Sequence, residues 1–306
     1  MRILHLLQWP LSDINDDIME VVKNQGFDAI QINPIQPLKE DLTLADLKWW
    51  MSYQPCDLSI GNQYGSKEDL VACCERAKQH ELKIFVDVIV THMAESLNGN
   101  FEPHERVVTR LRDRKEFWKE KKGIEDWHNR YQVINYNNGL PGLRIDNHEL
   151  QDMIIEFLNS LIDCGVDGFR FDSAKSIGLP EEGCDFFPRV LSNLKRQDLV
   201  NYVEILYEPD EFLEKYGRFA MVLTGNYAGN NENSIIFGES HDTFYGEGAI
   251  GTSRNWTSKE AASYYEMLSS KYDNTLFFAR PWDNQWKHEI VKNANRFYHR
   301  QYRKEA

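Results

Sequence analysis

The sequence predicts an α/β protein, a (β/α)8 barrel of parallel strands with an insertion after the third strand. Short apolar runs alternate with segments of helical periodicity along most of the chain, which is typical of βαβ units. A length of 306 residues with 42% hydrophobic residues suits one barrel with a large core. Several apolar runs also end in acidic residues or histidines, as strands do at the carboxyl face of such a barrel.

Eight runs rich in β-branched and aromatic residues are the predicted strands. They cover residues 2–8, 29–33, 83–90, 168–172, 201–206, 219–224, 234–238 and 275–279. Helical periodicity is clearest in Lys67–His80, Glu149–Cys164, Lys259–Ser270 and Gln285–Arg303, where crossover helices are needed. We expect Gly165 to cap the second of these helices, because glycine readily adopts the left-handed conformation that ends many helices.

Two stretches interrupt the alternation. Residues 93–142 are rich in charged residues, asparagine and glycine, so we interpret them as an excursion between the third strand and the third helix. The charged run Arg110–Lys122 within them is interpreted as a solvated helix face rather than a binding surface. Residues Gly225–Asn233 are too short and too rich in asparagine and glycine for a crossover helix. The sixth helix is therefore expected to be missing.

Composition excludes several classes of partner. The net charge of -13 argues against nucleic acid and anionic membrane surfaces, because both would repel the chain, whereas a neutral ligand is compatible with it. The amino terminus turns polar too soon for a signal peptide, and no apolar run reaches the roughly 18 residues needed to span a bilayer. We therefore expect a cytoplasmic protein. The five cysteines are odd in number and lack metal-ligand spacing, so we expect reduced thiols.

Four of the predicted strands lead into residues that could carry chemistry. Alternation along Gly168–Asp172 places Arg170 and Asp172 on one face, where the arginine would keep the carboxylate ionised. Taken alone, Glu204 is more typical of an edge-facing or salt-bridged acid, and a single histidine of a structural residue. Because the carboxyl ends of parallel strands converge, distant carboxylates could still meet over one substrate. The candidates in chain order are Asp87, His92, Arg170, Asp172, Glu204, His241 and Asp242.

These motifs resemble the α-amylase superfamily of retaining glycoside hydrolases, most closely the animal-type α-amylases. The likeness runs from about Ile3 to about Arg300 and includes Ile3–Trp9, Gly26–Pro34 and Trp49–Pro55. It implies that residues 1–92 and 143–306 form the catalytic TIM barrel and that residues 93–142 are a small inserted B domain. It also implies that the family's usual C-terminal β-sandwich is absent, because the sequence stops after the predicted eighth helix.

The resemblance assigns roles to three carboxylates. Hydrolysis with retention needs a carboxylate nucleophile and a second carboxyl, roughly 5 Å away, that first donates a proton and then accepts one. Asp172 is implied as the nucleophile and Glu204 as the acid/base. Asp242 is implied as the third carboxylate, which orients the sugar and favours distortion of its ring. We interpret Asp87 as structural, bonded to Arg170 or to backbone around the site.

The resemblance also implies a sugar-binding set. Sugars present flat apolar faces edged by hydroxyls, so a glucan cleft needs aromatic platforms and hydrogen-bonding groups. Aromatic clusters are more often core, but two adjacent tryptophans in a loop cannot both face one core. Trp50 and Tyr53 are implied to stack on sugars, and the two histidines to bond hydroxyls at the cleaved position. The implied binding residues are Trp49, Trp50, Tyr53, Gln54, His92, Arg170, Lys175 and His241.

Two functional hypotheses follow. The first is a retaining α-glycoside hydrolase of the α-amylase type, acting on α-1,4-glucans or maltooligosaccharides of starch or glycogen, with transglycosylation left open. The alternative is a non-catalytic glucan-binding or regulatory protein on a degenerate barrel, which the missing sixth helix and β-sandwich would suit. The three carboxylates favour the enzyme. The expected partner is an oligosaccharide or polysaccharide α-glucan, and the protein is expected to be a monomer or a homodimer.

No cofactor and no metal ion are expected. In the family, a calcium ion takes ligands from positions that here read Thr91, Gly142 and the carbonyl of Ser176. Calcium prefers six to eight oxygens with one or more carboxylates, which a threonine hydroxyl and a glycine do not supply. Asp146 remains open as a displaced carboxylate, and chloride is not expected although the sequence leaves it open. The insertion would instead be held by packing of residues such as Trp118, Trp127 and Tyr131.

Overall fold

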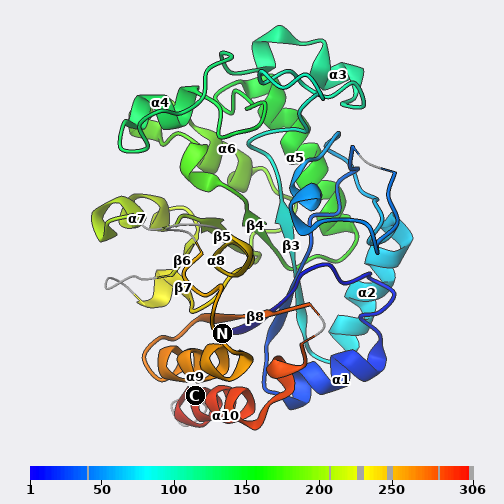
Figure 1. Ribbon diagram of the computed structural model, residues 1–306, viewed down its shortest axis with the longest axis vertical. Helices are drawn as coiled ribbons and strands as arrows, with labels where there is room; N and C mark the ends of the chain where they lie inside the picture. Colours follow the sequence, from blue (N-terminus) through cyan, green and yellow to red (C-terminus); the bar gives the residue numbers. More distant parts are fainter. Residues whose placement is uncertain (40, 207, 226–230, 247–250, 282, 303–306) are drawn as a thin grey trace. The chain divides into compact units, whose positions relative to one another are not determined.

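Eight parallel strands form the framework of the fold. A computed structural model describes residues 1–39, 41–206, 208–225, 231–246, 251–281 and 283–302, and its strands close into a barrel in chain order (Figure 1). Every strand predicted from the apolar runs is confirmed, with each boundary within two residues of the predicted one. They are β1 Arg2–Leu6, β2 Ala29–Ile32, β3 Lys83–Val88, β4 Gly168–Phe171, β5 Val200–Glu204, β6 Met221–Thr224, β7 Ser234–Phe237 and β8 Thr275–Ala279.

The strands are apolar because their residues are buried on both faces, as is usual in parallel sheets. All residues of β1, β4 and β8 are buried. The parallel register pairs Phe171 of β4 with Val203 of β5. Asp172 follows Phe171, and Glu204 follows Val203. This register therefore brings two carboxylates to the same end of two adjacent strands.

The chain divides into two compact units, and the first contains residues 1–33, 71–85 and 205–306. In its sheet, β1 lies between β2 and β8, and β7 lies between β6 and β8. The long helices α9 and α10 pack against each other, and α9 also packs on β7 and β8. The α-helices of this unit are α1 Asp16–Asn24, α7 Asp210–Gly217, α8 His241–Tyr245, α9 Ser258–Ser269 and α10 Glu289–Tyr302, the last preceded by the 3-10 turn η6 Gln285–Lys287.

The second unit contains residues 34–70 and 86–204, and α2 (Lys67–Gln79) and β3 run from one unit into the other. Its helices near β4 and β5 are α5 His148–Asp163 and α6 Phe186–Ser192, with 3-10 turns η1 Trp49–Tyr53, η3 Ala174–Ser176 and η4 Pro180–Glu182. The first three helices predicted from periodicity are confirmed as α2, α5 and α9, with each boundary within one residue. The fourth is confirmed as α10, but it starts at Glu289 because Gln285–Lys287 form η6, and Arg303 lies outside the described residues. Gly165, at φ 97°, follows Cys164, the C-cap of α5, and has the left-handed conformation expected of a glycine that ends a helix.

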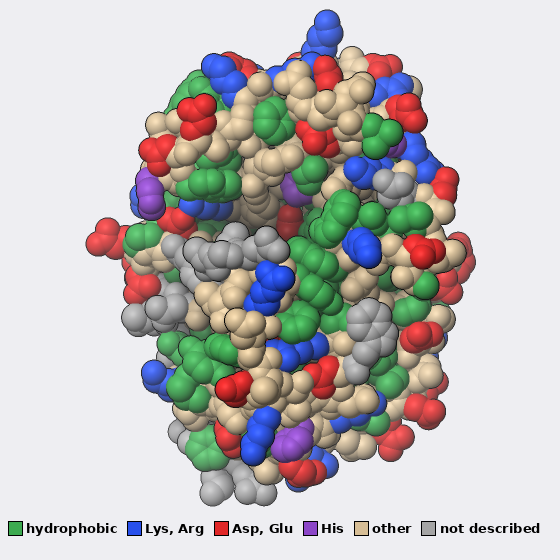
Figure 2. Space-filling view, in the orientation of Figure 1, with side chains coloured by type: hydrophobic (Ala, Val, Ile, Leu, Met, Phe, Trp, Pro, Cys, Tyr) green, Lys and Arg blue, Asp and Glu red, His purple; other side chains and the backbone are tan. Residues whose placement is uncertain are grey.

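Residues 93–142 contain little regular structure: α3 Thr109–Arg112, the 3-10 turn η2 Lys115–Phe117 and α4 Arg130–Asn135. Acidic and basic side chains are interspersed in the upper part of Figure 2, where Figure 1 places α3 and α4. Arg114 pairs with Glu116 and Glu149, and Lys121 pairs with Glu102. Most charged side chains of the run are therefore solvated, with Lys119 as the exception, but the run is α-helical only up to Arg112, so the predicted helix face is wrong over the rest. The status of residues 93–142 as a separate domain stays a prediction.

The connection from β6 to β7 is short. Its described part holds a single 3-10 turn, η5 Asn231–Asn233, and residues 226–230 lie outside the described residues. The missing sixth helix therefore stays a prediction. All five cysteine side chains are buried. Within the described part of the chain, no helix has the length and apolar character that crossing a membrane requires.

Candidate active site

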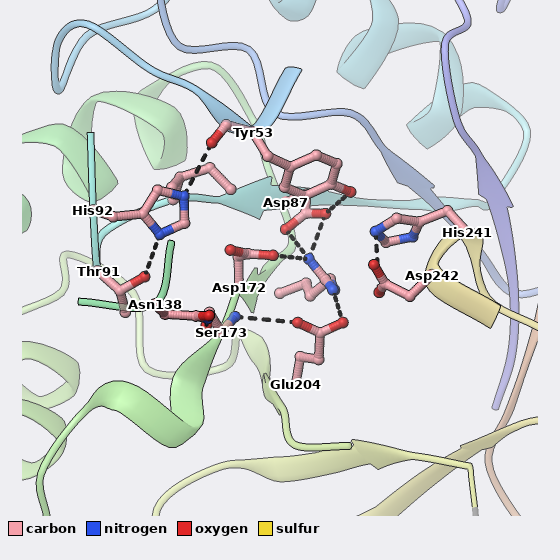
Figure 3. Close-up of polar contacts among 12 residues, drawn as sticks. Tyr53, Asp87, Thr91, His92, Asn138, Asp172, Ser173, Glu204, His241 and Asp242 are labelled. Atoms are coloured by element: carbon pink, nitrogen blue, oxygen red, sulfur yellow. Dashed lines mark hydrogen bonds and ion pairs between the residues drawn. The ribbon is translucent and has the colours of Figure 1, made fainter. Parts of the chain in front are cut away.

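Arg170 is the centre of a buried cluster of acids in the second unit. Its side chain is only 1% exposed. Its Nη1 lies 2.7 Å from both oxygens of Asp87 and 3.0 Å from Oδ1 of Asp172, and its Nη2 contacts Oε1 of Glu204 (Figure 3). The expectation that Asp87 bonds to Arg170 is therefore confirmed. One guanidinium holds three carboxylates, which lie on β3, directly after β4 and at the end of β5.

The cluster has a strong electrostatic asymmetry, because three acids share one cation. Burial alone would lower the pKa of Arg170, but Asp87, Glu204 and Asp172 raise it well above its ordinary value, so the guanidinium stays charged. Burial raises the pKa of Asp87, Arg170 opposes this rise, and Asp172 and Glu204 reinforce it, so that together these effects bring the pKa to about 7. The surroundings of Asp87 thus disfavour its ionised form.

Glu204 has a second donor besides Arg170. The backbone N–H of Ser173 donates to Oε2 of Glu204 at 3.1 Å. Ser173 follows Asp172 in the chain and adopts a left-handed conformation, φ 49° and ψ 37°. Its hydroxyl accepts a hydrogen bond from Nδ2 of Asn138 at 2.9 Å (Figure 3). Neither Ser173 nor Asn138 was predicted, and no local sequence signal marks this contact.

The ring of His92 is hydrogen-bonded through both nitrogens to other protein groups. Its Nε2 donates to the carbonyl oxygen of Tyr53 at 3.0 Å, and its Nδ1 lies 3.0 Å from the hydroxyl of Thr91, which donates to it. Burial lowers the pKa of His92 despite the opposing effect of Asp172, which agrees with this tautomer. Both ring nitrogens thus bond to protein atoms, and its contact with a sugar hydroxyl stays a prediction.

The predicted aromatic set lies on and after η1. Trp50 is 42% exposed, as a sugar platform must be, and the Trp49 and Tyr53 rings meet edge to face at 6.1 Å. Tyr53 itself is 8% exposed, and its hydroxyl donates to Oδ2 of Asp87 at 2.9 Å. Gln54 is buried, and among the described residues its Oε1 has no hydrogen-bond partner. The contacts of Trp50, Tyr53 and Gln54 with a sugar stay predictions.

Lys175 lies on η3, directly after the turn that contains Ser173. Its Nζ is 5.5 Å from the centre of the Trp127 ring, a cation–π distance. Trp127 is itself 44% exposed. The predicted contact of Lys175 with the leaving group stays untested.

His241 and Asp242 belong to the first unit, so the structure does not place them relative to the Arg170 cluster. They start α8, whose capping box joins Ser240 and Thr243. His241 Nε2 lies 3.4 Å from Oδ2 of Asp242, and His241 meets the ring of His5 edge to face at 5.4 Å. The roles of Asp242 as the third carboxylate and of His241 as a ligand of sugar hydroxyls stay predictions.

The sequence reasoning missed a buried ion pair beside His241. Arg280, just after β8, donates to Glu239, just after β7, through Nε at 2.7 Å and Nη2 at 2.6 Å. The guanidinium also lies 4.5 Å from the centre of the Phe244 ring. The one available signal is that each residue ends an apolar run. This pair fixes the loop from which α8 begins.

The residues around Gly142 do not suit a calcium ion. Thr91 directs its hydroxyl to His92, and Asp146 pairs with Arg144 at 2.7 Å. A Cβ atom on Gly142 would lie 2.7 Å from Cδ of Lys119, so the lysine stem fills the space that an acidic side chain would need. Nearby, Arg130 donates to the carbonyls of Lys175 and Ile177. Basic side chains here disfavour a cation, and the absence of calcium remains a prediction.

Comparisons with known proteins agree on one family. The model of the α-amylase catalytic domain matches residues 16–245. An α-amylase of Clostridium acetobutylicum is 29% identical over 96% of this chain, and the chain spans only 43% of that protein's length. The solved structure of α-amylase I from Eisenia fetida superposes with a TM-score of 0.80 at 18% identity, covering 97% of this chain and 77% of that one. A mutant of that enzyme in complex with maltohexaose gives 0.76 at 17% identity, with the same coverage.

Proposed function

The chain belongs to the α-amylase family through its catalytic domain, and from this membership we propose that it is a retaining α-glycoside hydrolase acting on α-1,4-glucans. Asp172 would be the nucleophile and Glu204 the acid/base. The Eisenia fetida relative was solved with maltohexaose, which supports a maltooligosaccharide as the substrate class. Transfer to a second sugar would use the same groups.

The observation that carries the proposal is that Asp172 and Glu204 contact the same guanidinium. Asp172 lies 3.0 Å from Nη1 of Arg170, and Glu204 contacts Nη2. Carboxyls bridged by one side-chain group are close neighbours, which favours the roughly 5 Å spacing of retaining enzymes over the roughly 6.5–9.5 Å of inverting ones. Arg170 would keep Asp172 ionised for attack on the anomeric carbon.

The two carboxyls would divide the chemistry between them. Asp172 attacks the anomeric carbon and the bond to the leaving-group oxygen breaks as Glu204 donates its proton to that oxygen. Glu204 then takes a proton from water, which attacks the glycosyl–Asp172 ester and releases a sugar of unchanged anomeric configuration. Activity thus requires an ionised Asp172 and a protonated Glu204, which predicts a bell-shaped pH profile whose alkaline limb reports Glu204.

The test is the anomer released from maltooligosaccharides. Proton NMR of fresh digests should show the α-anomer first, followed by mutarotation. An initial β-anomer would refute retention. Binding of maltooligosaccharides without any products would instead favour the alternative, a non-catalytic glucan-binding protein.

Paired substitutions test the two roles. Asp172→Asn and Glu204→Gln keep shape but remove the chemistry, so kcat should fall by at least about a thousandfold while the circular dichroism spectrum is unchanged. Asp198→Asn is a matched control, because Asp198 is an exposed acid paired with Arg196. Either site variant retaining more than about a tenth of wild-type activity would refute its assignment.

A further inference from the structure

Ser173, the residue after Asp172, has a left-handed backbone conformation that points its N–H at Glu204. Ser173 lies in the left-handed region at φ 49° and ψ 37°, which residues other than glycine, asparagine and aspartate seldom adopt. This conformation directs the Ser173 N–H toward Oε2 of Glu204, 3.1 Å away. Arg170 contacts the other oxygen, Oε1. Each oxygen of the Glu204 carboxyl therefore has its own donor, and one of them depends on a strained turn.

The Ser173 side chain is held from residues 93–142. Nδ2 of Asn138 donates to the Ser173 hydroxyl at 2.9 Å, and Figure 3 shows Asn138 beside this turn. The neighbouring Asn137 is buried and anchors the segment, because its Oδ1 accepts the Gly142 N–H at 2.7 Å and its Nδ2 donates to the Lys122 carbonyl at 2.9 Å. Asn138 thus projects from a fixed backbone rather than from a free loop end.

We propose that Asn138 is a positioning residue for Glu204: by bonding the Ser173 hydroxyl, it holds the left-handed turn that aims the Ser173 N–H at the Glu204 carboxyl. The proposal rests on the proposed role of Glu204 as acid/base. A backbone N–H favours the ionised form of the carboxyl that it contacts. Asn138 therefore helps to set the pH above which Glu204 no longer has a proton to donate.

The first experiment compares pH profiles of kcat/KM on a maltooligosaccharide. In Asn138→Ala the turn loses its side-chain support, so the alkaline limb should move to higher pH by about half a unit and kcat should fall roughly threefold, with KM nearly unchanged. Ser173→Ala removes the same contact from the other side and should have the same effect. The double variant should be no more affected than either single variant. Asn98→Ala is the control, because Asn98 is an exposed asparagine of the same segment.

The variant Ser173→Gly tests whether the effect passes through the left-handed backbone conformation of residue 173. Glycine adopts the left-handed conformation without strain, so in Ser173→Gly the turn no longer needs Asn138. Ser173→Gly lacks the hydroxyl but should keep the turn, so its alkaline limb should stay close to that of the wild type, and Asn138→Ala should have no further effect in this background. An alkaline limb that moves in Ser173→Gly as it does in Ser173→Ala would overturn the proposed route through the turn.

Other outcomes also decide the matter. Asn138→Ala that raises KM without moving the alkaline limb, or that adds fully to Ser173→Ala, would show direct contact with substrate and overturn the proposal. An unchanged profile would overturn it as well. Activity retained by Glu204→Gln would refute the proposed function itself. An inactive Glu204→Gln variant combined with an unmoved limb in Asn138→Ala would refute only the positioning role.

Discussion

Lys119 provides a sensitive test of how residues 93–142 pack, because its ammonium group is buried. Its stem occupies the space left by Gly142, where a Cβ atom would lie 2.7 Å from Cδ of the lysine. Its Nζ donates to the carbonyl of Tyr136, the C-cap of α4, at 3.2 Å. Cations are favoured at the carboxyl end of a helix, yet burial separates this one from water.

The free-energy cost of burying this charge follows from the pKa of Lys119. Burial and, to a smaller extent, Arg130 lower it while Asp146 and Cys184 oppose them, and together these effects bring it from 10.5 to about 8. Each pKa unit corresponds to about 1.4 kcal/mol, so burying the charge costs the folded state about 3 kcal/mol. Below pH 8 the ammonium is charged in both states and this cost is present in full. Between about pH 8 and 10.5 the unfolded state binds more protons, so the unfolding free energy rises with pH.

The assay is urea unfolding of the wild type and of Lys119→Met at several values between pH 7 and 10.5. Methionine retains most of the stem but does not titrate. The unfolding free energy of the wild type relative to Lys119→Met should rise by about 3 kcal/mol across this range, and groups common to both chains cancel in the difference. Lys121→Met is the matched control, because Lys121 is 50% exposed and pairs with Glu102. A difference between wild type and Lys119→Met that is flat, or that falls with pH, would refute the burial of this charge.

Three further predictions address the site and the insertion. EDTA followed by added calcium should change neither the melting temperature nor the activity, because Lys119 occupies the space beside Gly142; a shift of several degrees would reveal a calcium site. Arg170→Met should lower the unfolding free energy by about 3–5 kcal/mol at pH 7, since buried carboxylates lose their shared cation; urea unfolding that shows no loss would contradict the cluster. Trp50→Ala should raise KM for maltooligosaccharides several-fold at nearly constant kcat, and a change in kcat alone would argue against a sugar platform.

The barrel strands were predictable because their signal is local. Residues buried on both faces must be apolar at every position, so each strand appears as an unbroken run whatever the rest of the chain does. A second local rule, the alternation of side chains along an extended strand, predicted that Arg170 and Asp172 share one face. In the structure Nη1 of Arg170 lies 3.0 Å from Oδ1 of Asp172. The proximity of Glu204 required the register of β4 against β5, which no single run encodes.

Contacts between distant segments were not predictable. The sequence predicts Tyr53 as a platform for a sugar ring. Its hydrogen bond to Asp87, 34 residues further along the chain, was not predicted. Asn138 meets Ser173 across 35 residues, and nothing in the sequence of either segment specifies that pair. A hydrogen bond of this kind depends on the path of the intervening backbone, and neither periodicity nor motif spacing contains information about that path.

The sequence by itself determined the barrel strands, the acid and arginine residues that follow them and the α-amylase family, because these depend on residue type and on spacing within short segments. Only the tertiary structure decided that Asp87, Asp172 and Glu204 share the Arg170 guanidinium, and that the Ser173 turn bonds both Glu204 and Asn138. It also decided that the stem of Lys119 fills the space left by Gly142. The physical reason is that charge sharing and close packing depend on distances between groups that folding brings together from separate parts of the chain.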